Sequence, residues 1–260
     1  MTKKIIFLII VILGLVLIFK TQMNNDKKNQ EEIEKTMSEV AIFPISHASL
    51  ILAWGGFSIY VDPVDENKAN IFEGRTPPDI VLITDIHGDH FDVDTLKKVT
   101  KDNTIIVAPR AVLDIMPEEL KPKVRMMSNA DITSLLGFSV EAIPMYNLPE
   151  SDKSFHIKGR GNGYVIEKDS MRVYISGDTS GIPEMKNLKN IDMAFVAMNL
   201  PYTMGVEEAA DATLAFKPKK VYPYHYRTPD GFSDVARFKE LLNAKDPAIE
   251  VIQLDWYTKP

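Results

Sequence analysis

Thr84-Asp85-Ile86-His87-Gly88-Asp89-His90 is the stretch of this chain that says most about its fold. It follows the apolar run Ile80-Val81-Leu82-Ile83, which predicts a buried strand, and it precedes residues 91–98, which predict the start of a helix. Gathered carboxylates cost free energy unless a positive charge lies among them. The strand-to-helix turn therefore predicts a site for one or two divalent cations, with four candidate ligands: Asp85, His87, Asp89 and His90.

The composition excludes several classes of protein and site. A length of 260 residues allows one large domain, and 45% hydrophobic and 25% charged residues are typical of a globular chain. The formal net charge of −6 argues against a general nucleic-acid binder, so no nucleic-acid partner is expected. The chain has no cysteine, which excludes disulfides, thiolate zinc sites and cysteine nucleophiles.

The N-terminal segment differs from the rest of the chain. Lys3 and Lys4 precede the uncharged apolar run Ile5–Phe19, which predicts a signal anchor, a transmembrane helix over residues 1–20. With the lysines held inside, the rest would be an extracytoplasmic domain on a single-pass membrane protein. A cleaved secretory signal has the same composition, but no small-x-small cleavage site follows. Residues 21–39 are expected to form a polar stalk, and residues 40–260 the folded domain.

From Val40 onward, strand-like and helix-like segments alternate, which predicts two sheets with helices packed outside them. The predicted strands are Val40–Pro44, Ser49–Ala53, Phe57–Val61, Ile80–Thr84, Thr104–Ala108, Phe138–Ile143, Gly163–Glu167, Arg172–Ser176, Ala194–Ala197, Lys220–Pro223 and Glu250–Leu254. The predicted helices are Asp92–Val99, Ala111–Met116, Ile182–Lys189, Val206–Phe216 and Asp234–Asn243.

Further polar residues lie at predicted strand ends or turns. Asp178 follows an apolar strand in Ile175-Ser176-Gly177-Asp178, where it could also serve an Asx turn or a helix N-cap. The glycine-rich stretch from Lys158 to Gly163 lacks the strand-loop-helix context of a nucleotide motif. The five histidines all occupy such positions, which makes them candidate ligands together with Asp178: His47, His87, His90, His156 and His225.

Asp85-x-His87-x-Asp89-His90, then His156, Gly177-Asp178-Thr179 and His225, resembles the ligand series of the metallo-β-lactamase fold superfamily. Ser46-His47-Ala48-Ser49, Val61-Asp62-Pro63 and Pro223-Tyr224-His225 are similar to its branch with the ascorbate-phosphate lactonase-like proteins and the N-acyl-phosphatidylethanolamine phospholipases D. The resemblance covers about residues 40–257. It implies an α/β fold of the α+β type, a four-layer αββα sandwich, here preceded by the membrane-anchor helix.

The resemblance also implies a ligand set. A first metal would take Asp85, His87 and His156, a second would take Asp89, His90 and His225, and Asp178 would bridge them. Two Zn²⁺ ions are expected, with Mn²⁺ or Fe²⁺ as alternatives.

Specific roles are expected of four residues. Asp85 stands where the superfamily normally has a histidine, so it could bind a metal directly or support a ligand and leave one position weak. Asp89, or a metal-bound water, is expected to pass a proton to the leaving group. His47 is expected either to contact substrate or to make a structural hydrogen bond, while Asp62 is expected to support the ligand loop.

These implications point to a membrane-anchored metal-dependent hydrolase that is not a β-lactamase. It would use a metal-bound hydroxide to cleave an ester-type bond, either a lactone or carboxylic ester or a phosphodiester. The expected partners are a small-molecule or lipid substrate and, through the N-terminal helix, a membrane. The alternative is a non-catalytic metal-binding or scaffold protein with a degenerate site at Asp85.

Overall fold

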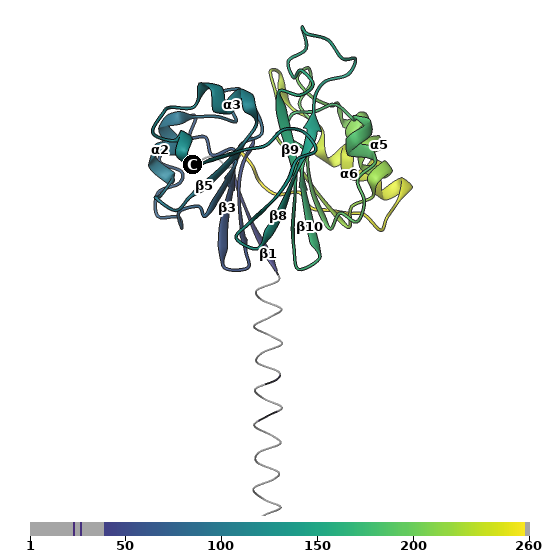
Figure 1. The fold of residues 1–260 in the computed structure, drawn as a ribbon. Coiled ribbons are helices and arrows are strands. Elements are labelled where there is room, and N and C mark those ends of the chain that lie inside the picture. Colours follow the sequence, from purple (N-terminus) through teal and green to yellow (C-terminus); the bar gives the residue numbers. More distant parts are fainter. Residues whose placement is uncertain (1–22, 24–26, 28–38, 258–260) are drawn as a thin grey trace, which may run out of the picture. The chain divides into compact units, whose positions relative to one another are not determined.

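The structure is a computed structural model that describes Met23, Lys27 and residues 39–257 (Figure 1). The predicted segments 1–20 and 21–39 therefore lie outside the described residues, apart from Met23, Lys27 and Glu39. The chain divides into two units. One comprises residues 1–41 and 54–56; the other, residues 42–53 and 57–260, holds most of the described strands and helices and every candidate site residue.

Two mixed sheets organise the described residues. The first has six strands in the order β1-β2-β3-β4-β5-β6, with β3 to β6 parallel. Its strands are β1 (Val40–Ser46), β2 (Ser49–Trp54), β3 (Phe57–Val61), β4 (Ile80–Leu82), β5 (Ile105–Ala108) and β6 (Val124–Met126).

The second sheet has seven strands in the order β15-β12-β11-β10-β9-β8-β7, and β10, β11, β12 and β15 are parallel. Its strands are β7 (Ile132–Leu135), β8 (Phe138–Met145), β9 (Gly161–Lys168), β10 (Met171–Ile175), β11 (Met193–Ala197), β12 (Lys220–Tyr224) and β15 (Glu250–Val251). A separate small hairpin pairs β13 (Arg227–Thr228) with β14 (Gly231–Phe232).

Capping hydrogen bonds and backbone angles determine where several of the helices begin and end. Asp92 caps α2 by accepting a hydrogen bond from the Thr95 backbone N–H at 2.7 Å, and Asp234 caps α6 in the same way through Arg237 at 2.8 Å. Helix α5 ends at Lys217, whose left-handed φ of 48° stops the helical turn. The helices are α2 (Val93–Val99), α3 (Arg110–Ile115), the 3₁₀ turn η1 (Lys121–Lys123), α4 (Pro183–Lys186), α5 (Val206–Phe216) and α6 (Val235–Lys245).

Each sheet is covered by helices on its outer side, as predicted (Figure 1). Leu96 of α2 and Val112 of α3 belong to one apolar cluster with Val81 of β4. Phe216 of α5 and Phe238 of α6 belong to another cluster with strands of the second sheet. Burial of these apolar faces supplies the main free energy that holds the helices against the sheets.

This topology places the predicted site residues at the carboxyl ends of strands in both sheets. Loops leave the carboxyl ends of the parallel strands β3, β4, β10, β11 and β12, the positions where α/β proteins collect ligands. The candidate residues Asp178 and His225 come shortly after β10 and β12. The stretch from Thr84 to His90 follows β4 in the same way.

The prediction of a single-pass membrane protein with an extracytoplasmic domain is corrected. A span needs about 20 apolar residues in one helix. Among Met23, Lys27 and residues 39–257, no helix is long and apolar enough to cross a bilayer, and the longest, α5 and α6, have 11 residues each. The run Ile5–Phe19 itself lies outside the described residues.

Candidate metal centre

Asp62 anchors the ligand turn after β4. Its Oδ1 accepts from the Thr84 backbone N–H at 2.7 Å, and its Oδ2 accepts from the Thr84 hydroxyl at 2.6 Å. The same Oδ2 lies 2.8 Å from His90 Nδ1, and all three residues are fully buried. The contact between Asp62 and His90 holds the His90 ring with Nε2 directed away from Asp62. Asp62 is thus in a position to support the ligand loop, as expected.

Four side chains bring ligand atoms to one point: Asp89, His90, Asp178 and His225. His90 Nε2 lies 3.2 Å from His225 Nε2 and 3.4 Å from Asp178 Oδ2. His225 Nε2 lies 3.4 Å from both Asp178 Oδ1 and Asp89 Oδ2. Ligands at about 2.1 Å from a tetrahedral ion lie about 3.4 Å from one another. The spacing of His90, Asp178 and His225 therefore matches a metal position, and Asp89 borders it through its contact with His225.

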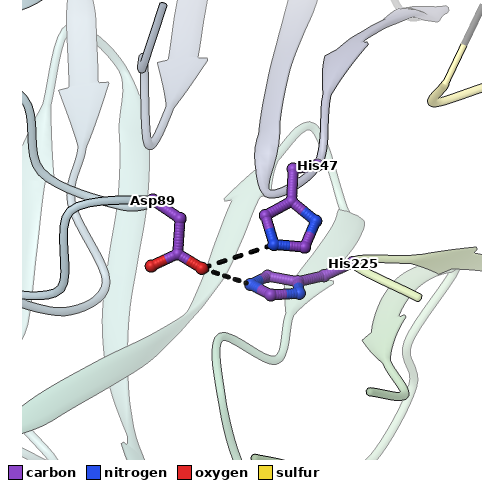
Figure 2. Close-up of side chains that lie close together, drawn as sticks. All are labelled: His47, Asp89 and His225. Atoms are coloured by element: carbon purple, nitrogen blue, oxygen red, sulfur yellow. Dashed lines mark ion pairs between the residues drawn. The ribbon is translucent and has the colours of Figure 1, made fainter. Parts of the chain in front are cut away.

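His47 joins this cluster more closely than the sequence predicted. It lies in the tight turn between β1 and β2, and Figure 2 shows its ring and that of His225 directed at one oxygen of Asp89. His47 Nε2 lies 3.3 Å from Asp89 Oδ2, and its Nδ1 lies 2.8 Å from the Tyr257 hydroxyl. His47, Asp89 and His225 thus form a second group able to hold a cation.

The other predicted ligands also meet, but a guanidinium lies among them. Asp85, His87 and His156 form a group able to hold a cation, and His156 Nε2 lies 3.7 Å from Asp85 Oδ2. His87 Nδ1 lies 2.8 Å from the same oxygen. Arg160 donates to both Asp85 oxygens, at 3.2 Å from Nε and 3.1 Å from Nη2. The Asp85 carboxylate is therefore already paired.

Two buried atoms test whether the residues fit a metal. His156 Nε2 and Asp178 Oδ1 make no hydrogen bond among the described residues. Leaving buried polar atoms without a partner is costly, and native proteins rarely do so. Both atoms are of the types that bind divalent cations, and both face the cluster. The donor set fits a bound cation.

The carboxylates of the cluster are held in their ionised form. Burial opposes the charge of Asp178, but the imidazoles of His225 and His90 outweigh it, and the pKa of Asp178 lies well below its usual range. For Asp89, burial is likewise outweighed by bonds to His225 and His47, so its pKa is lowered. Metal ligands must be deprotonated, and both carboxylates meet that requirement at neutral pH.

His47 is held in its neutral form. Burial, the largest cause, lowers its pKa to about 4, although the bond to Asp89 acts in the opposite direction. A neutral imidazole has one N–H and one lone pair, so a His47 that donates from Nε2 to the Asp89 carboxylate accepts at Nδ1 from the Tyr257 hydroxyl.

Two asparagines orient the histidines and were not assigned a role from the sequence. Asn147 Oδ1 accepts from the His156 backbone N–H at 2.8 Å and lies 3.2 Å from His156 Nδ1. Asn199 Nδ2 lies 2.8 Å from His225 Nδ1. The only signal for Asn199 is its place just after the fully buried strand β11. Nothing in the local sequence of Asn147 indicates its partner.

The cluster opens into a cavity of about 430 Å³. Asp89 reaches this cavity with a third of its side chain exposed, whereas His90 and His225 lie fully buried beneath it. Arg227 borders the cavity and pairs with Glu66 at 3.1 Å. The full lining is His47, His87, Asp89, Phe155, His156, Asp178, Asn199, Tyr202, Arg227, Thr228 and Pro229.

The fold and the ligand series agree with the comparisons to known proteins. Residues 41–225 match the family described as the beta-lactamase superfamily domain. The chain belongs to the metallo-β-lactamase superfamily. This confirms the resemblance to the superfamily, and the chain is a metal-dependent hydrolase.

Several known proteins are similar in sequence to most of this domain. A UPF0173 metal-dependent hydrolase of Thermococcus onnurineus is 33% identical over 176 residues, which are 66% of this chain and 77% of the relative. One from Pyrococcus horikoshii is 30% identical, over 77% of this chain and 91% of the relative. A metal-dependent hydrolase from Parabacteroides distasonis, known from its crystal structure, is 39% identical in sequence. The two structures superpose with a TM-score of 0.72, and the match covers 82% of this chain and 92% of the other.

Proposed function

We propose that this superfamily hydrolase cleaves an ester-type bond in a small-molecule or lipid substrate, either a lactone or carboxylic ester or a phosphodiester. The observation that carries the proposal is the convergence of Asp89, His90, Asp178 and His225 at the spacing of a metal coordination shell. They lie beneath a cavity that is open to solvent.

Zn²⁺ is the proposed metal, because imidazole nitrogens and carboxylate oxygens without thiolates suit it, with Mn²⁺ or Fe²⁺ as alternatives. His90, Asp178 and His225 would hold it, with Asp89 beside them at 3.4 Å from His225 Nε2; His47 forms a separate group with Asp89 and His225. The remaining predicted ligands, Asp85, His87 and His156, lie on the far side of Asp178. The bound cation supplies Lewis acidity and activates water for attack at neutral pH.

The side chains around the metal divide the remaining tasks. Asp89 is the most exposed carboxylate of the cluster, so we assign it the proton relay: the ionised carboxylate would take a proton from the attacking water and pass it to the leaving oxygen. His47 orients Asp89 through the contact at 3.3 Å and is itself fixed by Tyr257. Asp62 and Asn199 hold the rings of His90 and His225 in place.

The proposal is tested by turnover of the metal-loaded full chain on three chromogenic probes, one for each bond: an aryl lactone, an aryl carboxylic ester and bis(p-nitrophenyl) phosphate. Asp178→Asn removes charge from the centre of the cluster and is expected to reduce turnover by about 100-fold or more. The control is Asp169→Asn, a surface aspartate with a 67% exposed side chain, which should retain full activity. Equal turnover in wild type and Asp178→Asn, or no turnover on any probe, would contradict the proposal.

A further inference from the structure

Arg160 lies at the position where the superfamily pattern places part of its first metal site. Its guanidinium donates to both oxygens of Asp85 and lies 3.3 Å from His87 Nε2. It also donates to the Phe155 carbonyl oxygen, and only a fifth of its side chain is exposed. A positive group therefore already contacts two of the three predicted ligands of that site.

The backbone around Arg160 is built to hold it there. Gly159 has a left-handed φ of 85°, and the Asn162 backbone N–H donates to the Thr84 carbonyl oxygen at 2.9 Å. A Cβ at Gly161 would lie 2.9 Å from that same carbonyl oxygen, so only glycine allows this approach. Asn129 donates to the Gly161 carbonyl oxygen at 2.9 Å. The backbone just after Arg160 is thus held against Thr84, the residue next to Asp85.

The charges of the site balance with one metal. Asp89 and Asp178 offset one divalent cation, and Asp85 offsets the guanidinium of Arg160. A second divalent cation between Asp85, His87 and His156 would have to lie beside the guanidinium, where like charges repel. The superfamily normally has a histidine at the position of Asp85, and a neutral histidine would not form an ion pair with an arginine. Asp85 and Arg160 therefore belong together as a substitution for a metal ion.

We propose that the chain binds one metal ion, on the side of Asp89, His90, Asp178 and His225, and that the Arg160 guanidinium replaces the second cation. The proposal rests on the metal site of the proposed function and departs from the two-metal expectation. Arg160 then supplies a fixed positive charge next to Asp85 and His87, on the side of the site where a second ion would otherwise hold an anionic part of the substrate.

The test is the number of zinc equivalents retained by the purified full chain after saturation with Zn²⁺ and gel filtration, measured by mass spectrometry. Wild type is expected to retain one equivalent. Arg160→Gln frees Asp85, His87 and His156 and is expected to retain two, whereas Arg160→Lys keeps a cation and is expected to retain one. Arg237→Gln, at a half-exposed arginine on α6, is the control and is expected to match wild type.

The outcomes separate this proposal from the proposed function. Two equivalents in wild type, or a single equivalent in folded Arg160→Gln, would overturn the replacement of a metal by Arg160. If Arg160→Gln does not fold, the wild-type count and Arg160→Lys still decide. Wild type with two equivalents and full hydrolysis would overturn only this inference, and wild type with one equivalent and no hydrolysis on any probe would overturn only the proposed function.

Discussion

Single residues outside the candidate ligand set hold the ligands of this site in position. Asp62 fixes His90, Asn199 fixes His225, and Asn147 fixes His156. Each bond is made to the Nδ1 atom and leaves Nε2 directed into the cluster. In metal sites such outer contacts set ring orientation and ligand basicity.

Asn199→Ala is expected to weaken zinc affinity by about 10- to 100-fold without unfolding the chain, because the His225 ring loses its Nδ1 partner. Isothermal titration of the metal-free full chain with Zn²⁺ measures this affinity. Asn243→Ala on the exposed side of α6 is the matched control and should leave it unchanged. An unchanged zinc affinity in Asn199→Ala would show that the ring needs no such support.

The candidate ligands could be named from the sequence, but of the residues that hold them only Asp62 could. Asp178 and His225 follow apolar strands, a pattern visible in one dimension. Asn199 and Tyr257 contact histidines that lie 26 and 210 positions away, and no local pattern encodes such contacts. The pairing of Asp85 with Arg160 spans 75 positions and was missed for the same reason.

At the scale of elements, the site depends on sharp turns that follow strands. His47, Asp62 and His225 all adopt left-handed backbone conformations, with φ of 51°, 42° and 49°. Residues other than glycine rarely adopt such angles, which cost roughly 1–3 kcal/mol each and concentrate at functional sites. The turns direct these side chains into the cluster instead of along the strand.

At the start of β9, the backbone passes close to the turn that follows β4. Gly161→Ala is expected to lower the free energy of unfolding by about 1–3 kcal/mol, since its Cβ would lie 2.9 Å from the Thr84 carbonyl oxygen. Guanidinium titration of the metal-free chain measures the change. Gly88→Ala, where a Cβ meets nothing within 4 Å, is the control and should stay within about 0.5 kcal/mol of wild type. Equal losses in both variants would contradict the close approach.

Most elements follow from the sequence, and the missed ones have a physical reason. Phe57–Val61 and Val206–Phe216 have the predicted bounds, because a buried β-rich run and an amphipathic helix are strong local signals. β6 and β7 were missed: each lies at the edge of its sheet with at least half of its residues exposed. Edge strands lack the apolar pattern that burial imposes.

At the scale of the whole molecule, both sheets contribute to one metal centre. The turn after β4 belongs to the first sheet, while Asp178 and His225 come from the second. The order of the motifs predicted this convergence through the family resemblance. Which half of the site holds the metal depends on the side-chain contacts of Arg160, and these exist only in the folded chain.

The central claim is that His90, Asp178 and His225, with Asp89, hold a metal. The direct measurement is an anomalous-difference map at the zinc absorption edge from crystals of the zinc-loaded full chain. The account predicts a peak bonded to Nε2 of His90 and His225 and to the carboxylates of Asp89 and Asp178. A map with zinc bound only elsewhere on the chain, or with no peak among these four side chains, would contradict it.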